Sequence, residues 1–258
     1  MTLLDAERVS PGARPFPPVA IELQALTKSF GAARVVDDVS VQVLGGEVVG
    51  LLGPNGAGKT TTLRMLAGLI TPSAGSARVC GIDVMKDPLQ ARRQLGFLTA
   101  STGLYDRLTV REILNTFGRL YGLAKDPLGL RIQTLIEELD LSRFIDRRCG
   151  TLSSGEKQRA SIARAIVHDP QVYVLDEPTA ALDPLASSAI LDLVRRARNR
   201  NKAVLFSTHR MEEAEFLCDR LAFLRAGKIV TEGTAGQLRE RSGQPTLTGA
   251  FLHFARAQ

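Results

Sequence analysis

The chain has 258 residues, of which 44% are hydrophobic and 23% charged, and its net charge is +6. This composition is typical of a globular protein with one large domain or two closely joined lobes. No stretch approaches the roughly 18 uninterrupted apolar residues of a membrane-spanning helix. The first ten residues carry charges and lack the apolar segment of a secretory signal. We therefore expect any relation to a membrane to be peripheral or made through a partner.

Neither the cysteines nor the basic residues indicate a metal or a nucleic acid. Cys80, Cys149 and Cys218 lie far apart without metal-ligand spacing, so reduced thiols of a cytosolic protein are the expected state. The basic residues are scattered, and aromatic residues make up only 5% of the chain. The densest basic cluster, at 195–200, is interpreted as the solvated last turn of a helix. No nucleic-acid partner is expected.

The N-terminal part of the chain predicts a leader, then strands, then a strand followed by a helix. Residues 1–18 contain four prolines and are expected to be a flexible leader. Residues 20–44 alternate apolar and polar side chains, which is typical of strands and predicts an N-terminal antiparallel β subdomain. Residues 48–52 form a buried-strand run, and an amphipathic helix is expected to begin at 61–66.

The remaining elements alternate between strands and helices. Val79 is expected to begin a strand, and residues 95–98 form another. The helical pattern at 110–139 is expected to be interrupted by glycine and proline, at Gly122, Pro127 and Gly129. Short apolar strands are expected at 172–175 and 203–206. This order predicts an α/β fold with a mainly parallel sheet and a mainly helical insertion at about 100–165.

Residues 53–60 read Gly-Pro-Asn-Gly-Ala-Gly-Lys-Thr, which matches the spacing of a phosphate-binding loop. The glycines let the backbone curl so that several N–H groups point at one anion. Lys59 would supply positive charge for the terminal phosphates, and the Thr60 hydroxyl can ligate Mg²⁺. Because the loop lies between a strand and a helix, this arrangement favours a P-loop NTPase over a glycine-rich turn without a ligand.

A second acidic motif follows an apolar strand. Asp176 and Glu177 come directly after the run at 172–175. In phosphate-loop enzymes, an aspartate at such a strand end holds Mg²⁺, and an adjacent glutamate can accept a proton from an attacking water. Acidic residues also commonly begin turns, so this motif alone is weak evidence of a metal or catalytic site. It indicates such a site only in combination with the phosphate loop.

Residues 152–159, Leu-Ser-Ser-Gly-Glu-Lys-Gln-Arg, open a helix that can be interpreted in two ways. Ser153 and Glu156 have the spacing of a helix-capping box. A Ser-Ser-Gly helix start is also suited to bind a phosphate through its N-terminus. Both interpretations are retained.

Taken together, these motifs resemble the nucleotide-binding subunits of ATP-binding-cassette (ABC) transporters over roughly residues 20–235. Residues 53–61 match the Walker A motif, 152–159 the signature and 172–177 the Walker B motif. Residues 181–183 resemble the D-loop, and 207–209 match the segment of the switch histidine. The resemblance implies that ATP and Mg²⁺ are the cofactors.

The resemblance also implies roles for individual residues. It places Lys59, Glu177 and His209 in catalysis, and Thr60 and Asp176 on Mg²⁺. Two such subunits would pack head to tail around two ATP molecules as a homodimer or a heterodimer. The residues expected to bind nucleotide or link the two sites are Phe30, Gly53, Asn55, Gly56, Gly58, Lys59, Thr60, Thr61, Ser153, Gly155 and Asp183.

The sequence departs from the family pattern in two places. The signature carries Ser154 and Glu156 where the pattern has Gly and Gln, which is expected to tune the contact with ATP. Ala100 stands where most relatives have a Gln that contacts Mg²⁺ and the attacking water. Ser101, Thr102 or a water is expected to fill that place, and basal hydrolysis is expected to be slow.

The segment 96–112 resembles the ATPases of two-component exporters, such as sodium and drug exporters, in which a separate permease subunit spans the membrane. Residues 246–252 resemble the ending of such ATPases. This similarity implies a cytoplasmic subunit that lies on the inner face of the membrane through its permease. It leaves the transported substrate open, and it gives the direction of transport by resemblance alone.

The expected organisation is a leader at 1–18, an ATPase domain at 19–240 and a short C-terminal extension at 241–258. Two alternatives to an exporter ATPase stay open. One is an ABC ATPase that acts on ribosomes or DNA, and the other is a nucleotide-binding module that regulates a soluble partner. Turnover of ATP and the identity of the partner distinguish them.

Overall fold

The computed structural model describes residues 19–99, 103–180, 182 and 184–256. The predicted leader at 1–18 lies outside the described residues, as do Ala100, Ser101, Thr102 and Asp183. The strands are β1 (Val19–Phe30), β2 (Ala33–Leu44), β3 (Val48–Leu52), β4 (Ala74–Val79), β5 (Ile82–Asp83), β6 (Leu95–Leu98), β7 (Val172–Asp176), β8 (Ala203–Thr208), β9 (Arg220–Arg225) and β10 (Lys228–Gly233). The helices are α1 (Lys59–Leu66), α2 (Pro88–Arg93), α3 (Val110–Leu120), α4 (Lys125–Glu138), η1 (Cys149–Thr151), α5 (Ser154–Ile166), α6 (Pro184–Asn199), α7 (Met211–Leu217), α8 (Ala235–Ser242) and α9 (Leu247–Arg256).

The strands form two sheets, which confirms the predicted α/β class. One sheet has the order β2-β1-β4-β5 and is antiparallel throughout. The other has the order β10-β9-β3-β8-β7-β6, and its pairs are parallel except for β9 with β10. In the parallel part, β3, β7 and β8 are apolar because both of their faces are covered.

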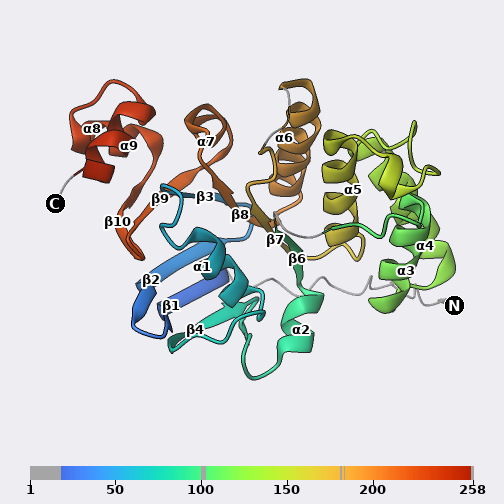
Figure 1. The fold of residues 1–258 in the computed structure, drawn as a ribbon, viewed down its shortest axis with the longest axis horizontal. Helices are drawn as coiled ribbons and strands as arrows, with labels where there is room; N and C mark the ends of the chain where they lie inside the picture. The colour runs from blue at the N-terminus through green and yellow to red at the C-terminus, as the bar shows by residue number, and fades with distance from the viewer. Residues whose placement is uncertain (1–18, 100–102, 181, 183, 257–258) are drawn as a thin grey trace, which may run out of the picture.

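Alternating side chains of the central strands pack into two separate hydrophobic cores. In β7, Tyr173 and Leu175 pack with the helices α3 to α6, whereas Val172 and Val174 pack toward α1, α2 and the antiparallel sheet. This alternation follows from the two-residue period of a strand. Figure 1 shows the result, with the antiparallel sheet, α1 and α2 on one side of the mixed sheet and α3, α4, α5 and α6 on the other.

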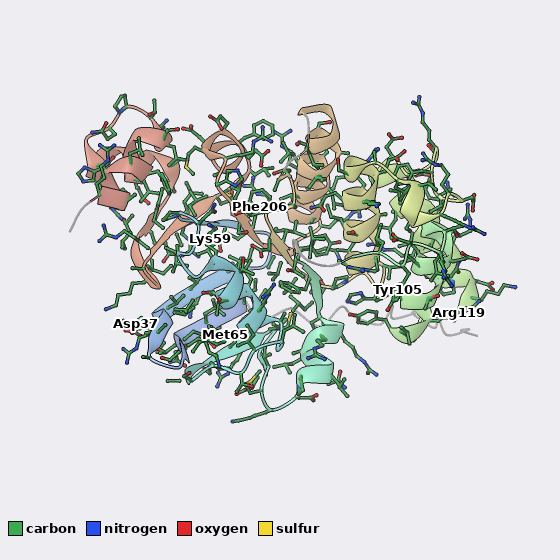
Figure 2. The ribbon with its side chains drawn as sticks, viewed as in Figure 1. Asp37, Lys59, Met65, Tyr105, Arg119 and Phe206 are labelled. Atoms are coloured by element: carbon green, nitrogen blue, oxygen red, sulfur yellow. The ribbon has the colours of Figure 1, made fainter. Side chains whose placement is uncertain are left out.

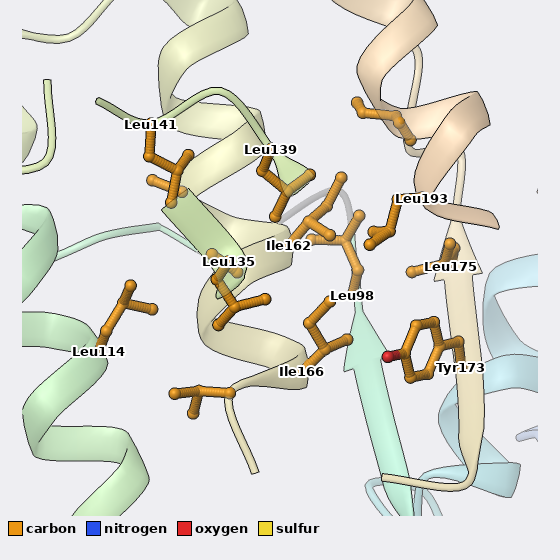
Figure 3. Packing of buried hydrophobic residues seen from close by; sticks show 14 of the residues in the cluster. Leu98, Leu114, Leu135, Leu139, Leu141, Ile162, Ile166, Tyr173, Leu175 and Leu193 are labelled. Carbon is orange, nitrogen blue, oxygen red and sulfur yellow. The ribbon is translucent and has the colours of Figure 1, made fainter. Parts of the chain in front are cut away.

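Figure 3 shows how the helical side is packed. Leu98 and Leu175 from the sheet lie close to Ile162 and Ile166 of α5 and to Leu193 of α6. All five are buried. Burying one such side chain contributes on the order of 1.5–3 kcal/mol relative to an exposed one, so this core fixes α5 and α6 on the sheet.

Two local predictions were wrong. Val79 ends β4 rather than beginning a strand. The helical region is broken at Gly122, but Pro127 and Gly129 lie inside α4. Pro127 is the third residue of that helix, where the backbone N–H has no helical partner to lose, so the proline is tolerated.

The C-terminal helices α8 and α9 pack on the edge of the mixed sheet formed by β9 and β10. Their small apolar cluster unites Phe223 of β9 with Leu238 and Leu247. The rings of Phe223 and Phe251 lie 5.5 Å apart. Within the described ranges, no helix is long and apolar enough to cross a membrane.

Candidate nucleotide-binding site

The phosphate loop turns between β3 and α1 in a space that admits only glycine at two positions. A Cβ at Gly53 would lie 2.2 Å from the carbonyl oxygen of Leu224, and one at Gly58 would lie 2.7 Å from that of Val35. Gly58 also has φ +105° as the N-cap of α1, a conformation that other residues rarely adopt. The Gly227 N–H donates to the Ala57 carbonyl at 3.0 Å and fixes the loop from outside.

Lys59 lies at the centre of this loop and is buried. Its Nζ donates to the carbonyl oxygens of Gly53 at 2.7 Å and Pro54 at 3.1 Å, and lies 3.9 Å from Oε1 of Glu177. Burial lowers the pKa of Lys59, although the carboxylates of Glu177 and Asp176 act in the opposite direction. Figure 2 places Lys59 where the two sheets approach each other.

Most of the residues predicted from the loop motif line one pocket of about 170 Å³, and Gly53 is not among its lining residues. Its lining is Val35, Asn55, Gly56, Ala57, Gly58, Lys59, Thr60, Thr61 and Glu177. The first turn of α1 has no acidic residue, so its free N–H groups and positive dipole end face this space without a competing carboxylate. The pocket is therefore suited to a phosphate group.

Asp176 is buried at the end of β7 and has one unused oxygen. Its Oδ1 accepts a hydrogen bond from the Ser207 hydroxyl at 2.6 Å. Its Oδ2 is buried without a hydrogen-bond partner among the described residues. A buried carboxylate oxygen without a partner is costly, and an oxygen ligand of this kind suits Mg²⁺. The Asp176 side chain thus fits the predicted divalent cation.

Glu177 follows in a left-handed backbone conformation, with φ +48°. Its N–H is held by Ser207, through the carbonyl oxygen at 3.1 Å and the hydroxyl at 2.9 Å. Its Oε2 lies 3.2 Å from Nδ1 of His209, whose side chain is 56% exposed. The structure brings Lys59, Asp176, Glu177 and His209 together, and it adds Ser207, which binds the Asp176 carboxylate and the backbone N–H of Glu177.

Ser207 was not singled out by sequence reasoning because its role depends on strand register. It lies opposite Asp176 in the parallel pair of β7 and β8. In the sequence, a serine near the end of an apolar strand and two residues before a histidine is by itself a weak indication of a functional site.

The signature segment is a capping box. The Ser153 hydroxyl accepts from the Glu156 N–H, and Glu156 Oε2 accepts from the Ser153 N–H at 2.8 Å. Arg147 also pairs with Glu156, at 2.9 Å. Burial alone would raise the pKa of Glu156, but the Ser153 N–H and the charge of Arg147 lower it. This carboxylate is committed to contacts within the chain.

Ser153 and Gly155 do not line the phosphate-loop pocket. They line a separate hollow of about 760 Å³, which includes residues of α4, α5 and α6 such as Arg159 and Ser188. The single chain therefore presents two distinct surfaces, and its own signature residues do not complete the loop pocket.

Phe30 ends β1 and is 51% exposed. Nζ of Lys28 lies 5.1 Å from the centre of its ring and donates to the Thr71 carbonyl at 2.8 Å. Phe30 does not line the loop pocket, so its predicted role at adenine stays a prediction. Asp183, the predicted link between two sites, lies outside the described residues.

Comparison with known proteins agrees with this geometry. The family model described as ABC transporter matches residues 36–180. A second model, described as AAA domain, putative AbiEii toxin, Type IV TA system, matches residues 147–214, which span the signature and Walker B segments.

Named relatives match most of the chain. The ABC transporter ATP-binding protein NatA of Bacillus subtilis is 40% identical over 85% of this chain and 89% of its own. The Nod factor export ATP-binding protein I of Rhizobium meliloti is 44% identical over 84% of this chain and 65% of its own. The doxorubicin resistance ATP-binding protein DrrA of Mycobacterium tuberculosis is 42% identical, with 87% of this chain and 69% of its own covered.

Solved structures agree in fold. The ATP-binding subunit of an ABC transporter superposes with a TM-score of 0.86 at 31% identity, over 92% of this chain and all of its own. A dimeric bacterial ABC transporter cassette gives 0.76 at 27% identity, over 83% of this chain and 98% of its own. The chain belongs to the ABC transporter family, as one of its ATP-binding and ATP-hydrolysing subunits.

Proposed function

We propose that this chain hydrolyses ATP to drive an exporter whose membrane-spanning part is a separate permease. The observation that carries the proposal is a phosphate-sized pocket lined by Lys59 and Glu177, with His209 paired to Glu177 and Asp176 next to it in the chain. The printed names of the Rhizobium meliloti and Mycobacterium tuberculosis relatives, which refer to export and to drug resistance, support the export direction.

We assign the phosphates to Lys59, to the side chains of Asn55, Thr60 and Thr61, and to the backbone of the loop glycines Gly53, Gly56 and Gly58. Thr60 and Asp176 would hold Mg²⁺, which neutralises charge on the phosphate oxygens when bound. Glu177 accepts the proton of the attacking water, and His209 orients it together with Glu177. The orphaned Oδ2 of Asp176 supports this assignment of the metal.

A dimer follows from the separation of the two surfaces. Ser153 and Gly155 line a hollow away from the phosphate loop, so a second subunit is needed to bring a signature helix to the nucleotide. The N-terminus of α5 carries free N–H groups that suit a γ-phosphate. The partner is a second copy or a related chain, arranged head to tail, with Asp183 near the contact and Phe30 at the adenine.

The permease would dock beside α3, where the structure exposes apolar side chains. A hollow of about 380 Å³ lies between the mixed sheet and the helices, with Phe97, Tyr105 and Phe117 in its lining. Tyr105 is 62% exposed and Leu69, also in the lining, is 56% exposed (Figure 2). Clustered exposed apolar groups of this kind mark protein contacts. Docking there would hold the subunit at the cytoplasmic face of the membrane.

The division into a leader at 1–18, an ATPase domain at 19–240 and an extension at 241–258 is part of this proposal. The helices at 103–166 form the lobe that carries both the signature and the proposed permease contact. Helix α8 continues to Ser242, so the extension consists mainly of α9.

The test is a pull-down of a tagged Glu177→Gln variant from gently solubilised native membranes with ATP and Mg²⁺, followed by mass spectrometry. A multi-helix membrane protein in the eluate is expected. The proposed contact is tested with the double variant Glu177→Gln, Tyr105→Ala. This variant should bind ATP but no longer recover the membrane protein. Recovery of ribosomes, DNA or only soluble protein would overturn the transport function.

A further inference from the structure

We propose that Thr179 and Glu213 position the catalytic pair Glu177 and His209 by closing a ring of contacts between the ends of β7 and β8. The inference rests on the roles proposed above for Glu177 and His209. Thr179 and Glu213 are not among the residues that line the nucleotide pocket. They act through the backbone turns that carry the catalytic side chains.

The central contact is a short buried hydrogen bond. The Thr179 hydroxyl donates to Glu213 Oε2 at 2.5 Å. Thr179 is 1% exposed and Glu213 5% exposed. A hydroxyl–carboxylate bond of this length, removed from water, is among the stronger protein hydrogen bonds. It joins the turn after β7 to the first turn of α7.

The other oxygen of Glu213 is paired with the residue next to His209. Nη1 of Arg210 lies 2.7 Å from Glu213 Oε1. The Arg210 N–H donates to the Thr208 hydroxyl at 3.0 Å, which holds the bend between β8 and α7. Both partners of the buried carboxylate therefore belong to the segments that carry the catalytic pair.

These contacts complete a closed circuit. Glu177 leads through Pro178 to Thr179, then across to Glu213 and Arg210, then along the chain to His209, which returns to Glu177 at 3.2 Å. Because Glu177 has φ +48°, the turn that carries it is strained and needs outside contacts to persist.

A merely stabilising role is a poor account of this arrangement. A buried ionic group is often replaced by apolar side chains of similar volume without loss of stability. The polar circuit instead fixes two side chains whose separation decides whether a water can be held between Glu177 and the phosphate. A displacement of about 1 Å at such a site costs on the order of a hundredfold in rate.

The experiment compares steady-state ATP hydrolysis by Thr179→Val, which keeps the shape but removes the hydroxyl, with Thr179→Ser, which restores the hydroxyl. Glu213→Gln removes the charge, and Glu212→Gln, an exposed neighbour on α7, is its matched control. We expect kcat to fall roughly tenfold to a hundredfold in Thr179→Val and Glu213→Gln, with KM for ATP unchanged. Thr179→Ser and Glu212→Gln should behave like the wild type.

The deciding measurement places Thr179→Val in a Glu177→Gln background. If Thr179 acts through Glu177, the slow residual rate of Glu177→Gln should not fall further. A fall as large as in the wild-type background, or an unchanged kcat in both Thr179→Val and Glu213→Gln, would overturn the inference. Should Thr179→Val fail to fold, Glu213→Gln in the same background makes the same comparison.

Failure of the proposed function would give a different experimental result. In that case Glu177→Gln alone hydrolyses ATP at the wild-type rate, and no positioning of Glu177 matters. A slow Glu177→Gln together with wild-type rates in both Thr179→Val and Glu213→Gln leaves the proposed function standing and removes only the positioning circuit.

Discussion

Nδ1 of His209 lies 3.2 Å from Oε2 of Glu177, although the two residues follow different strands, β8 and β7. The register of the parallel pair β7 and β8 produces this contact. Asp176 lies opposite Ser207, so the segments that follow the two strands leave the sheet side by side. Their carboxyl ends meet at the edge where open α/β sheets bind ligands. The pair is therefore a consequence of strand order, and its function is testable by substitution.

Replacing Glu177 by Gln should lower kcat by about a hundredfold or more, because a positioned general base contributes about 10²–10⁴ in rate. The ATP-bound dimer should then accumulate, measurable by size-exclusion chromatography with ATP and Mg²⁺. Glu240→Gln, an exposed residue on α8, is the control. A Glu177→Gln protein with wild-type turnover would refute the base assignment.

Ala100→Gln should raise the basal rate of ATP hydrolysis and change its dependence on Mg²⁺ concentration. The reason is chemical, since alanine offers no oxygen to a metal or a water, whereas a glutamine carbonyl does. Rates measured across a Mg²⁺ titration check this expectation. Ser101→Ala and Thr102→Ala, measured alongside, show which neighbour supplies an oxygen in the natural chain. Identical titration curves for Ala100→Gln and the wild type would contradict the reasoning.

Ser153→Ala should lower the free energy of unfolding by about 1 kcal/mol, because it removes the N-cap of α5. Glu156→Gln should leave stability nearly unchanged, since a glutamine oxygen can still accept from the Ser153 N–H. Urea denaturation measures both. A Glu156→Gln protein as unstable as Ser153→Ala would show that the ion pair with Arg147, rather than the cap, dominates.

His168 should make the protein sensitive to acid. It is stacked on Tyr121, and burial lowers the pKa of His168 to about 4 from its ordinary 6.5. Between these two pKa values, His168 binds a proton in the unfolded chain but not in the folded chain. The free energy of unfolding therefore falls as pH falls from about 6.5 to 4. The loss between pH 7 and pH 5 is about 2 kcal/mol.

The measurement is urea denaturation of the wild type, His168→Phe and the exposed control His253→Gln at pH 7 and pH 5. His168→Phe keeps a ring to stack on Tyr121 and does not titrate, so its stability should depend less on pH. An equal pH dependence in His168→Phe and the wild type would assign the acid sensitivity to other groups.

Local patterns predicted the parts of the site that depend on neighbours in sequence. The loop at 53–60 and the capping box of Ser153 and Glu156 are of this kind, because their contacts span a few residues. The contacts of Ser207 and Glu213 join segments about 30 residues apart in the chain, so they depend on strand register and helix placement that no local pattern contains. Pro127 was misjudged for a related reason, since its effect depends on where the helix begins.

The turn at Gly227 connects both sheets to the phosphate loop. Its N–H donates to the Ala57 carbonyl at 3.0 Å, and its own carbonyl accepts from the Asp37 N–H at 2.8 Å. Lys228 adds an ion pair to Asp37 at 3.2 Å. Opening this turn would break all of these contacts at once, so we expect local unfolding there to loosen both sheets at the loop. A nucleotide in the loop would slow hydrogen exchange at the Asp37 and Gly227 amides together, so exchange at Asp37 in the antiparallel sheet would report whether the pocket is occupied.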